Sequence, residues 1–460
     1  MKPDTIVALA SGAGRAGVAV IRVSGPMAGA TLRALRSSGL PAPRLATFSA
    51  FRDANSGDLL DEGLALWFPA PRSFTGEDVA ELHVHGGPAV IEAIVGACLA
   101  RAGVRPAEPG EFTRRAFENG KLDLAQAEGL ADLVDAETEG QRRQALRQSR
   151  GALSEVYEAW RARLIEAAAL IEAEIDFPDE DLPEALARRA GPILEALGAD
   201  MARHLDDSHR GERVRDGYRI AIIGPPNAGK SSLLNALARR EAAIVSELPG
   251  TTRDVVEVRL VLGGFPVWIA DTAGLREAAD AVEAEGVRRA LARAEEADLI
   301  LFARDPASRD PSFFELLAGN RAPDIWVHTK ADLREPPPRA GIASLLQQFD
   351  AAQAGLGSAS PLEISVATGQ GLSELREKLA GMVVEALGRE EAPMLTRARH
   401  RRLVEAARAA LEQARAALSK GPELAAEDVR VAATAIGRLT GRIDVEGLLD
   451  EIFSSFCIGK

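Results

Sequence analysis

One stretch of this 460-residue chain combines glycines, a lysine and a serine at a spacing that suits phosphate binding. In "IAIIGPPNAGKSSLLNAL", residues 224–231 fit GxxxxGKS between an apolar strand and a helix. Glycines let backbone N–H groups face phosphate oxygens, and the N-terminus of the following helix adds its dipole. Lys230 is expected to reach the β- and γ-phosphates, and the Ser231 hydroxyl is expected to bind Mg²⁺.

Further motifs follow the phosphate loop in the order that a GTPase requires. "PGTTRD" supplies Thr251 and Thr252 on a loop, and "DTAG" places Asp271 at the end of an apolar strand, near the metal. "TKAD" closes another strand, and its Asp332 can accept hydrogen bonds from guanine N1–H and the exocyclic amine, a pair that adenine cannot supply. "ISVATG" fits a loop over the base. These motifs predict a GTPase.

Three positions add detail to the expected mechanism. Thr329 stands where GTPases usually carry Asn and lacks the amide that braces the loop, so a lower guanine affinity is expected. Leu275 stands where a Ras-type site has a water-orienting Gln, so hydrolysis needs another residue. Asn227, inside the phosphate loop, is placed to hold K⁺, which would stabilise transition-state charge as an arginine does. A purely loop-bracing Asn227 is the alternative.

Two N-terminal patterns resemble other kinds of site. "GAGRAG" matches a dinucleotide-binding motif, but the alternating "VAVIRVSG" follows it, so a hairpin loop is predicted. "ELHVHGG" puts Glu81, His83 and His85 on one face of a strand. Because no other His or Cys lies nearby in the sequence, a polar wall for an organic ligand is favoured over a metal site.

The elements that position these residues fall into three classes. Residues 1–118 are an α+β region, with strands at "TIVALAS", "GVAVIRVSG", "GLALWFPAP" and "DVAELHVHGG" and a helix at "AVIEAIVGACLARAG". Residues 119–215 are helical, with an apolar stripe from Leu153 to Ile175, and helix returns at 388–460. Residues 216–387 alternate strands and helices, which predicts a mainly parallel, helix-covered sheet inserted into the helical domain.

Composition limits the possible environments and partners. No apolar run approaches the ~18 residues that a membrane span needs. The only two cysteines, Cys98 and Cys457, form no disulfide framework or zinc motif, which favours a reducing cytoplasm. A net charge of −13 argues against a large autonomous nucleic-acid surface, although it allows a local basic patch.

The assembled chain resembles the MnmE (TrmE) family of tRNA modification GTPases over nearly its whole length. The resemblance is carried by "SFTGEDVAELHVHGG", "PGEFTRRAFENGKLDLAQAE", "DFPDE", "GPPNAGKSSLLNALARREAAIVSELPGTTRD", "DTAGLREA" and the terminal "FCIGK". The N-terminal blocks and the tail single out this family, because the GTPase motifs are widely shared. The resemblance implies a folate-binding, dimerising N-terminal domain similar to aminomethyltransferases, an all-α helical domain, and an inserted α/β P-loop G domain.

The resemblance also implies an activity and partners. The chain is expected to be a K⁺-dependent GTP hydrolase that uses Mg²⁺ and acts as a homodimer with the FAD-containing MnmG (GidA). The pair would place an aminomethyl or carboxymethylaminomethyl group on carbon-5 of the wobble uridine of certain tRNAs. The one-carbon unit would come from a tetrahydrofolate derivative, 5,10-methylene- or 5-formyl-. Contact with tRNA is expected mainly through the partner complex, and no membrane is expected.

Site residues carry over from the family motif by motif. The folate contacts map to Arg22, Glu81, Lys121 and the tail Lys460. The K⁺ ligands map to Asn227, Ser246, Leu248 and Thr251, the Mg²⁺ ligands to Ser231 and Thr252, and the acid that orients water indirectly to Glu283. The family usually has Thr where Ser246 stands. The expected GTP-binding residues are Asn227, Ala228, Gly229, Lys230, Ser231, Ser232, Ser246, Glu247, Leu248, Pro249, Gly250, Thr251, Thr252, Asp271, Thr272, Ala273, Gly274, Thr329, Lys330, Ala331, Asp332, Ser365, Val366 and Ala367.

The tail and two rival functions complete the hypotheses. Cys457 is a poor prenylation site, because Gly459 and Lys460 do not fit that motif. The tail is either structural or enters the folate site, with Cys457 close to the chemistry as a candidate catalytic residue. A ribosome-assembly or translation GTPase is one rival function, although such proteins usually append a basic RNA-binding domain. A folate-dependent transferase regulated by a G domain is the other.

Overall fold

The computed structural model describes residues 4–36, 38–176, 186–207, 209–240, 256–271, 293–307, 322–333, 361–388, 394–443, 446–454, 456, 458 and 459. The chain divides into two compact units. Unit 1 comprises Met1–Val134, Leu146–Ala202 and Arg402–Lys460. Unit 2 comprises Asp135–Ala145 and Arg203–Arg401.

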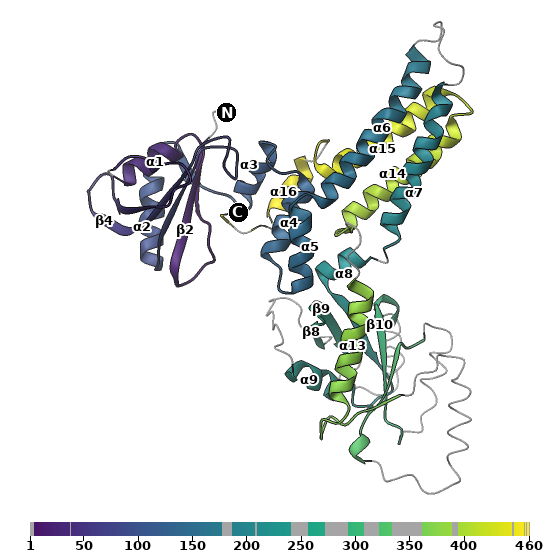
Figure 1. The fold of residues 1–460 in the computed structure, drawn as a ribbon. Helices are drawn as coiled ribbons and strands as arrows, with labels where there is room; N and C mark the ends of the chain where they lie inside the picture. Colours follow the sequence, from purple (N-terminus) through teal and green to yellow (C-terminus); the bar gives the residue numbers. More distant parts are fainter. Residues whose placement is uncertain are drawn as a thin grey trace, which may run out of the picture. The chain divides into compact units, whose positions relative to one another are not determined.

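The N-terminal part of unit 1 is a six-stranded sheet in the order β3-β4-β5-β2-β1-β6 (Figure 1). Neighbouring strands are antiparallel except the parallel pair of β1 and β6. Helices α1 and α2 bury one face of the sheet, where Ile21, Leu82 and Phe51 are fully buried. The elements are β1 (Thr5–Leu9), β2 (Ala16–Ser24), α1 (Ala28–Leu35), β3 (Thr47–Arg52), β4 (Leu59–Phe68), β5 (Val79–Gly86), α2 (Pro88–Leu99), β6 (Val104–Pro106) and α3 (Glu111–Glu118).

The predicted α+β class of this part is confirmed, and the structure adds elements that the sequence patterns did not reveal. Strands β1 and β2 form an antiparallel pair, so the "GAGRAG" segment between them is the predicted hairpin loop. Helices α1 and α3 have only eight residues each and were missed, as were the edge strands β3 and β6. Such short segments give little periodicity, and burial against the rest of the domain decides their structure.

The rest of unit 1 is helical. Leu153, Trp160, Leu164 and Ile171 of α6 are buried as the stripe predicted. Tyr157 and Ala167 are buried in place of the predicted Val156 and Ala168, and Ile175 is only partly buried. The Trp160 indole Nε1 donates to Asp200 Oδ2 of α7 at 2.8 Å. The elements are α4 (Leu124–Val134), α5 (Glu139–Ser149, which begins in unit 2), α6 (Ala152–Asp176), η1 (Leu186–Arg189), α7 (Ala190–Leu205, which ends in unit 2), α14 (Ala398–Ala417, which begins in unit 2), α15 (Pro422–Thr440) and α16 (Glu446–Ser454).

Unit 2 contains a second six-stranded sheet, in the order β12-β11-β10-β7-β9-β8. All neighbours are parallel except the β8–β9 hairpin, so the predicted mainly parallel sheet is confirmed. Ile222, Leu301 and Val327 lie in its fully buried core, to which α9 and α13 contribute. The elements are α8 (Arg210–Asp216), β7 (Tyr218–Ile223), α9 (Lys230–Arg240), β8 (Val256–Leu262), β9 (Phe265–Asp271), β10 (Leu299–Arg304), β11 (Ile325–His328), η2 (Ala331–Leu333), β12 (Leu362–Glu363) and α13 (Leu372–Leu387).

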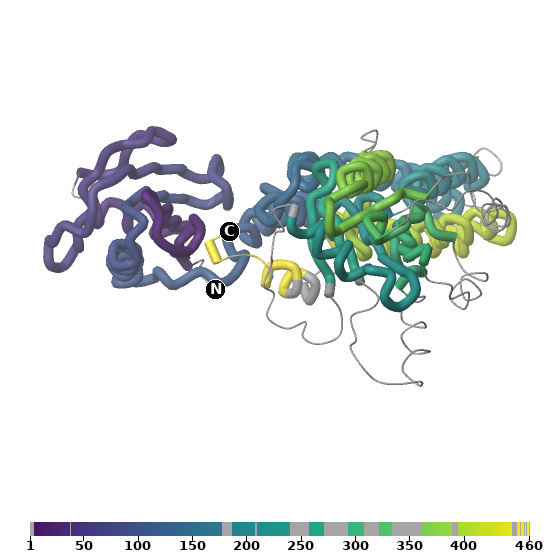
Figure 2. Tube along the Cα trace, turned by 90° about the horizontal axis from the view of Figure 1, so that it is seen from below, coloured from purple at the N-terminus to yellow at the C-terminus, as the bar shows by residue number. Residues whose placement is uncertain are grey.

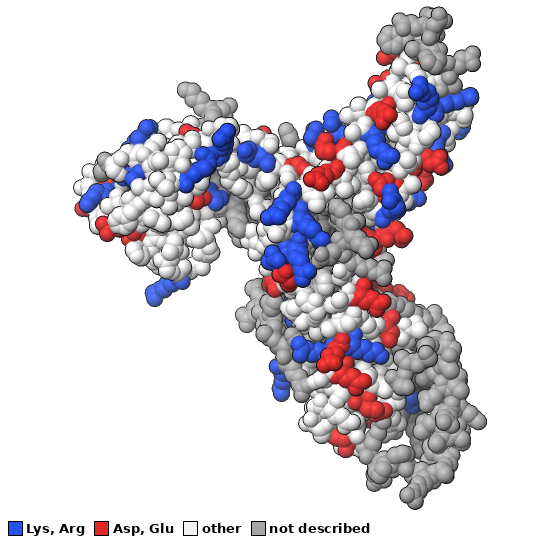
Figure 3. Space-filling model, viewed as in Figure 1, with Lys and Arg blue, Asp and Glu red and all other residues white. Residues whose placement is uncertain are grey.

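The surface shows a local concentration of basic side chains. Lys and Arg side chains gather over α5 in Figure 3, and Arg142 and Arg143 of this helix have half-exposed side chains. Both pair with Glu139, and these contacts, led by the hydrogen bond from Arg142, lower the pKa of Glu139 to about 2. The acidic chain therefore carries a local basic surface on one helix. Among the helices that the structure describes, none combines the length and apolar character needed to cross a membrane.

Candidate functional site

The phosphate loop of unit 2 joins the end of β7 to the start of α9, at the carboxyl end of the parallel strands. Gly224 has φ +149°, and a Cβ there would lie 2.0 Å from the Ala303 carbonyl oxygen, so only glycine fits. Gly229 and Asn227 are also left-handed, with φ values of +82° and +58°. The predicted strand–loop–helix arrangement is thus confirmed, and its glycines are required by backbone shape.

The lysine of the motif lies within this loop. Its side chain is buried, and Nζ donates to the Gly224 and Pro225 carbonyl oxygens at 2.8 Å each. A positive charge is therefore held against the same loop whose N–H groups would face phosphates. Ser231 follows in the first turn of α9, and Asp271 ends β9 opposite Ile222 of β7. The Ser231 hydroxyl is an oxygen donor of the kind that Mg²⁺ prefers.

The two segments predicted to bind the base lie next to each other. Asp332 is exposed in η2, directly after β11, and Val366 and Ala367 are exposed in the loop after Ile364. The Ala331 N–H donates to the Ile364 carbonyl oxygen at 3.0 Å, which joins the segments. An exposed carboxylate beside a second loop is a suitable arrangement for binding a purine edge.

Thr329 behaves differently from the expectation drawn from the sequence. Its hydroxyl donates to the Ala228 carbonyl oxygen of the phosphate loop at 2.7 Å, and the side chain is buried. The hydroxyl therefore braces the phosphate loop in place of an amide, and the lower guanine affinity stays a prediction. A hydroxyl suffices because the two backbones approach closely enough for one short donor to span them.

Several predicted site residues lie outside the described part of the chain, and the structure does not bear on them. Of the expected K⁺ ligands only Asn227 is described, and of the expected Mg²⁺ ligands only Ser231. The predicted residues outside the described ranges are Ser246, Glu247, Leu248, Pro249, Gly250, Thr251, Thr252, Thr272, Ala273, Gly274, Glu283, Cys457 and Lys460.

In unit 1, the sheet brings two predicted folate contacts together. Arg22 of β2 and Glu81 of β5 are direct partners across the two strands, and their side chains form an ion pair at 2.9 Å. The Arg22 guanidinium carbon lies 5.3 Å from the Phe74 ring centre and 5.7 Å from that of Phe112. The result is a half-buried charged pair that rests on the fully buried Phe112 ring and lies beside the partly exposed Phe74 ring, a surface suited to a flat polar heterocycle.

Lys121 contacts the loop that carries Phe74. Its Nζ donates to the Pro71 carbonyl oxygen at 3.1 Å. Its Cγ and Cδ atoms pack against Gly76, where an added Cβ would lie 3.4 Å from each. Phe74 and Phe112 were not predicted as site residues. Both rings belong to blocks that carry the family resemblance, "SFTGED" and "GEFTRRAFENGK". These blocks are far apart in the sequence, so the contact of both rings with Arg22 could not be predicted from it.

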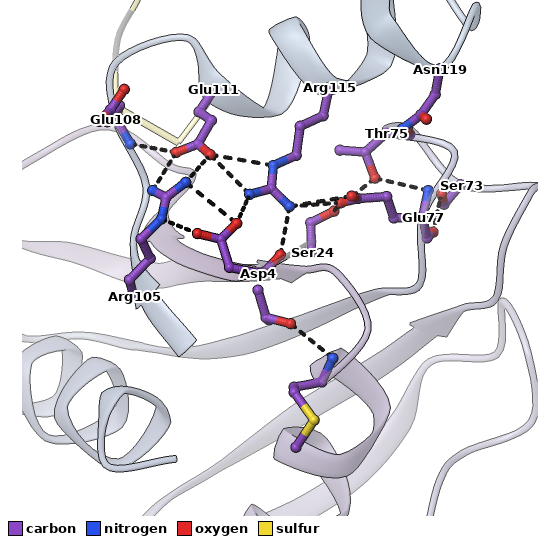
Figure 4. A network of polar contacts seen from close by, with 12 residues as sticks. Asp4, Ser24, Ser73, Thr75, Glu77, Arg105, Glu108, Glu111, Arg115 and Asn119 are labelled. Atoms are coloured by element: carbon purple, nitrogen blue, oxygen red, sulfur yellow. Dashed lines mark hydrogen bonds and ion pairs between the residues drawn. The ribbon is translucent and has the colours of Figure 1, made fainter. Parts of the chain in front are cut away.

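A polar network fixes this loop to α3 (Figure 4). Arg115 of α3 pairs with Asp4 at 2.8 Å, Glu111 at 2.9 Å and Glu77 at 3.1 Å. The pKa of Asp4 is lowered, chiefly by its hydrogen bond from Arg105. Burial by itself raises the pKa of Glu111, but hydrogen bonds from Arg105, a backbone N–H and Arg115 outweigh burial and lower it. The ion pair between Glu77 and Arg115 thus fixes the loop that carries Phe74 to α3.

The C-terminal tail lies against the N-terminal strands (Figure 2). Ile458 forms an antiparallel bridge with Pro109. Gly459 has φ +100°, and a Cβ there would lie 2.0 Å from the Leu9 carbonyl oxygen of β1. Since β1 pairs with the strand of Arg22, the described tail residues approach the sheet region of the Arg22–Glu81 pair.

The histidine face of β5 has the alternation that the sequence predicted. Glu81, His83 and His85 are the more exposed residues, while the residues between them are buried. His83 Nε2 lies 3.5 Å from Glu81 Oε2, and His85 Nδ1 lies 2.8 Å from Asp61 Oδ1. No group of three metal-ligating side chains occurs within the described ranges. The face therefore has the character of a polar wall.

Comparisons with known proteins cover nearly the whole chain. A family profile described as "GTP-binding protein TrmE N-terminus" matches residues 5–121, and one described as "MnmE helical domain" matches residues 124–457. The chain is 56% identical over 460 residues to the tRNA modification GTPase MnmE of Parvibaculum lavamentivorans, covering 99% of this chain and 100% of that protein. It is 55% identical over 457 residues to that of Maricaulis maris, covering 99% of each.

The matches to solved structures cover a smaller share of the chain than the family matches do. The G domain of the T. maritima FeoB iron transporter matches with 26% identity and a TM-score of 0.26, covering 37% of this chain and 98% of that one. The full-length identities are far more extensive and agree with the phosphate loop. The chain belongs to the MnmE family of tRNA modification GTPases.

Proposed function

We propose that this GTPase uses a folate one-carbon unit, together with an FAD-containing partner of the MnmG (GidA) type. The product would be an aminomethyl or carboxymethylaminomethyl group on carbon-5 of the wobble uridine of certain tRNAs. The observation that supports the folate step is the Arg22–Glu81 pair beside the Phe74 and Phe112 rings. The protein would act as a cytoplasmic homodimer, with tRNA bound mainly by the partner complex.

The chemistry of a pterin matches this surface. Arg22 engages Oε1 of Glu81, whereas Oε2 faces His83 Nε2 at the longer distance of 3.5 Å. Oε2 is therefore suited to accept hydrogen bonds from the N–H groups of a pterin, and the partly exposed Phe74 ring offers it flat contact. Lys121 and the tail Lys460 would meet carbonyl or glutamate oxygens of a 5,10-methylene- or 5-formyl-tetrahydrofolate.

The GTPase cycle is proposed to depend on K⁺ and Mg²⁺. The support for K⁺ is Asn227, which lies in the phosphate loop next to Ala228, the residue that Thr329 holds. Ser246, Leu248 and Thr251 would complete the K⁺ ligands, and Ser231 and Thr252 would bind Mg²⁺. Glu283 would orient the attacking water indirectly. Bound K⁺ would add positive charge beside the phosphates, where Lys230 already holds one.

The test is the modification state of the wobble uridine in cells that lack this protein. Mass spectrometry of tRNA nucleosides should show the carbon-5 group lost, then restored by the wild-type gene but not by Glu81→Gln. Glu92→Gln is a matched control, because Glu92 is an exposed carboxylate on α2, which covers the opposite face of the sheet. Purified Glu81→Gln should bind 5-formyl-tetrahydrofolate at least about tenfold more weakly. Unchanged modification and folate binding in Glu81→Gln would contradict the proposed site.

A further inference from the structure

We propose that the exposed arginines of α5 form a phosphate-binding surface that contacts the tRNA substrate directly. Arg142, Arg143 and Arg147 lie within α5, Arg150 closely follows it, and all four residues are exposed. Lys and Arg side chains gather over this helix in Figure 3. We refer to these four arginines as the α5 basic surface. The inference rests on the proposed tRNA modification function, and it names the part of this chain that would meet the tRNA backbone.

Helix geometry places three of these arginines in one row. Arg143, Arg147 and Arg150 follow one another at spacings of four and three residues, and residues so spaced project from the same side of an α-helix. The Arg150 N–H donates to the Leu146 carbonyl oxygen at 3.2 Å, so the helical pattern extends to this residue. At 1.5 Å per residue, the row is about 10 Å long.

Another side of α5 is held in place by buried amide groups. Three glutamines of this helix, again at spacings of three and four residues, are buried. Each donates a side-chain N–H to a backbone carbonyl oxygen at 2.8 or 2.9 Å. Such directional bonds fix the rotation of the helix about its axis, so the arginine row is ordered before it binds a ligand. The pairs are Gln141 with Arg215, Gln144 with Gly211 and Gln148 with Ala125.

The residue types favour a phosphate backbone as the occupant of this surface. All its cations are arginines, whose planar guanidinium can donate two parallel hydrogen bonds to one phosphate. An RNA strand carries a phosphate at every nucleotide, so a row of arginines can engage neighbouring phosphates. The sequence of α5, "EGQRRQALRQS", contains no aromatic residue on which a base could stack. The contact would therefore position the tRNA without reading its sequence.

Acidic groups limit the affinity of the α5 basic surface. The Glu139 carboxylate pairs with Arg142 at 2.7 Å and with Arg143 at 2.9 Å, so it competes with a phosphate for both guanidinium groups. The net charge of −13 also opposes the approach of RNA from a distance. The surface would therefore act at short range and weaken steeply with salt, which agrees with the proposal that the partner complex holds most of the tRNA.

The experiment measures binding of a fluorescently labelled tRNA transcript with a wobble uridine to the full-length protein, by anisotropy at several NaCl concentrations. The triple variant Arg143→Gln, Arg147→Gln, Arg150→Gln should bind about tenfold more weakly or worse. Its plot of log affinity against log salt should lose about 2 from its slope, because three phosphate contacts are removed. The control is a second triple variant, which removes three exposed arginines from α14 and α15 and should bind within about twofold of wild type. Its changes are Arg402→Gln, Arg415→Gln and Arg430→Gln.

Glu139→Gln tests the same surface in the opposite direction. It removes the competing carboxylate, so the tRNA should bind about twofold more tightly or better. A gain of affinity cannot come from partial unfolding, so this variant carries the test even if the triple variant does not fold.

Three results would overturn the proposal. The first is an unchanged affinity and salt slope in the α5 triple variant, and the second is an equal loss in the control. The third is normal tRNA binding in the α5 triple variant together with lost binding of the FAD-containing partner in gel filtration, since the surface would then serve a protein. The proposed function fails on a different readout, which is an unchanged wobble uridine in cells that lack this protein.

Discussion

At the residue scale, Asn227 combines two properties that have different consequences. Its φ of +58° is a left-handed conformation that Asn adopts more readily than most residues. Its amide oxygen is also the proposed K⁺ ligand. A single substitution to Ala removes both properties, so the conformational and the chemical role have to be separated by a second variant.

The first prediction concerns this separation. GTP turnover should rise about tenfold or more when Na⁺ is replaced by K⁺ at fixed ionic strength, because the cation adds charge stabilisation in the transition state. Asn227→Gly keeps the left-handed backbone and loses the amide, so it should bind GDP normally but no longer respond to K⁺. Asn227→Ala should lose the response and also bind GDP more weakly. Equal wild-type turnover in both salts would exclude the cation role.

Cys98 shows how burial controls the reactivity of a thiol. It is fully buried beneath the N-terminal sheet, and burial raises its pKa to about 12. The thiolate, which is the reactive form, is therefore very scarce at neutral pH. Any thiol chemistry of this protein should accordingly reside at Cys457.

The second prediction follows from this difference. Iodoacetamide at pH 8 should leave Cys98 unmodified in the native protein and modify it completely in urea, as measured by peptide mass spectrometry. Cys98→Ser serves as the control for peptide assignment. Rapid native labelling of Cys98 would show that the core around α2 opens more readily than its burial indicates.

At the scale of elements, the tail and the N-terminal sheet depend on each other. Phe456 and Phe453 anchor the tail in an apolar cluster with Leu124 of α4. Ile458 and Gly459 then run beside Pro109 and Leu9. The close approach at Gly459 leaves no room for a side chain, so this glycine controls where the last residues can lie.

The third prediction tests this arrangement. Deleting the last four residues should leave the steady-state GTPase rate nearly intact and abolish tRNA modification, because the phosphate loop belongs to the other unit. Gly459→Ala should have the same effect, whereas Ile458→Val should be silent, since Ile458 is exposed. Cys457→Ser distinguishes a reactive thiol from a structural one. Full modification in the deletion variant would reject any role for the tail.

At the scale of the whole molecule, ionised groups that link distant segments make stability depend on pH. Asp4 near the N-terminus and Glu111 of α3 are joined through Arg105 and Arg115 (Figure 4). Both carboxyl groups have lowered pKa values in the folded protein. The folded state therefore binds fewer protons than the unfolded state. This contribution is complete above the unfolded pKa values and is lost as the pH falls through the folded ones.

The fourth prediction applies this sign. In calorimetry, unit 1 is identified as the unfolding transition that GDP does not shift. Between pH 6 and 7, the contribution of the network to the free energy of unfolding should stay constant. The transition should lose stability below about pH 4.5, where the unfolded carboxyl groups begin to take up protons. Arg115→Met should destabilise this transition by about 3 kcal/mol at pH 7 and flatten its acid dependence, because Glu77 loses its guanidinium partner and Asp4 and Glu111 keep only Arg105. A variant that melts as the wild type does would contradict this account.

The sequence by itself determined the parts of this protein that depend on local order. The phosphate loop, most strands of both sheets and the family could be predicted, because spacing along one strand or one turn is a local property. Tertiary structure alone decided that Phe74 and Phe112 flank Arg22, that Arg115 holds the Phe74 loop, and that Thr329 reaches Ala228. Each of these contacts joins segments far apart in the chain. Their geometry comes from strand register and burial, which no spacing within a single segment encodes.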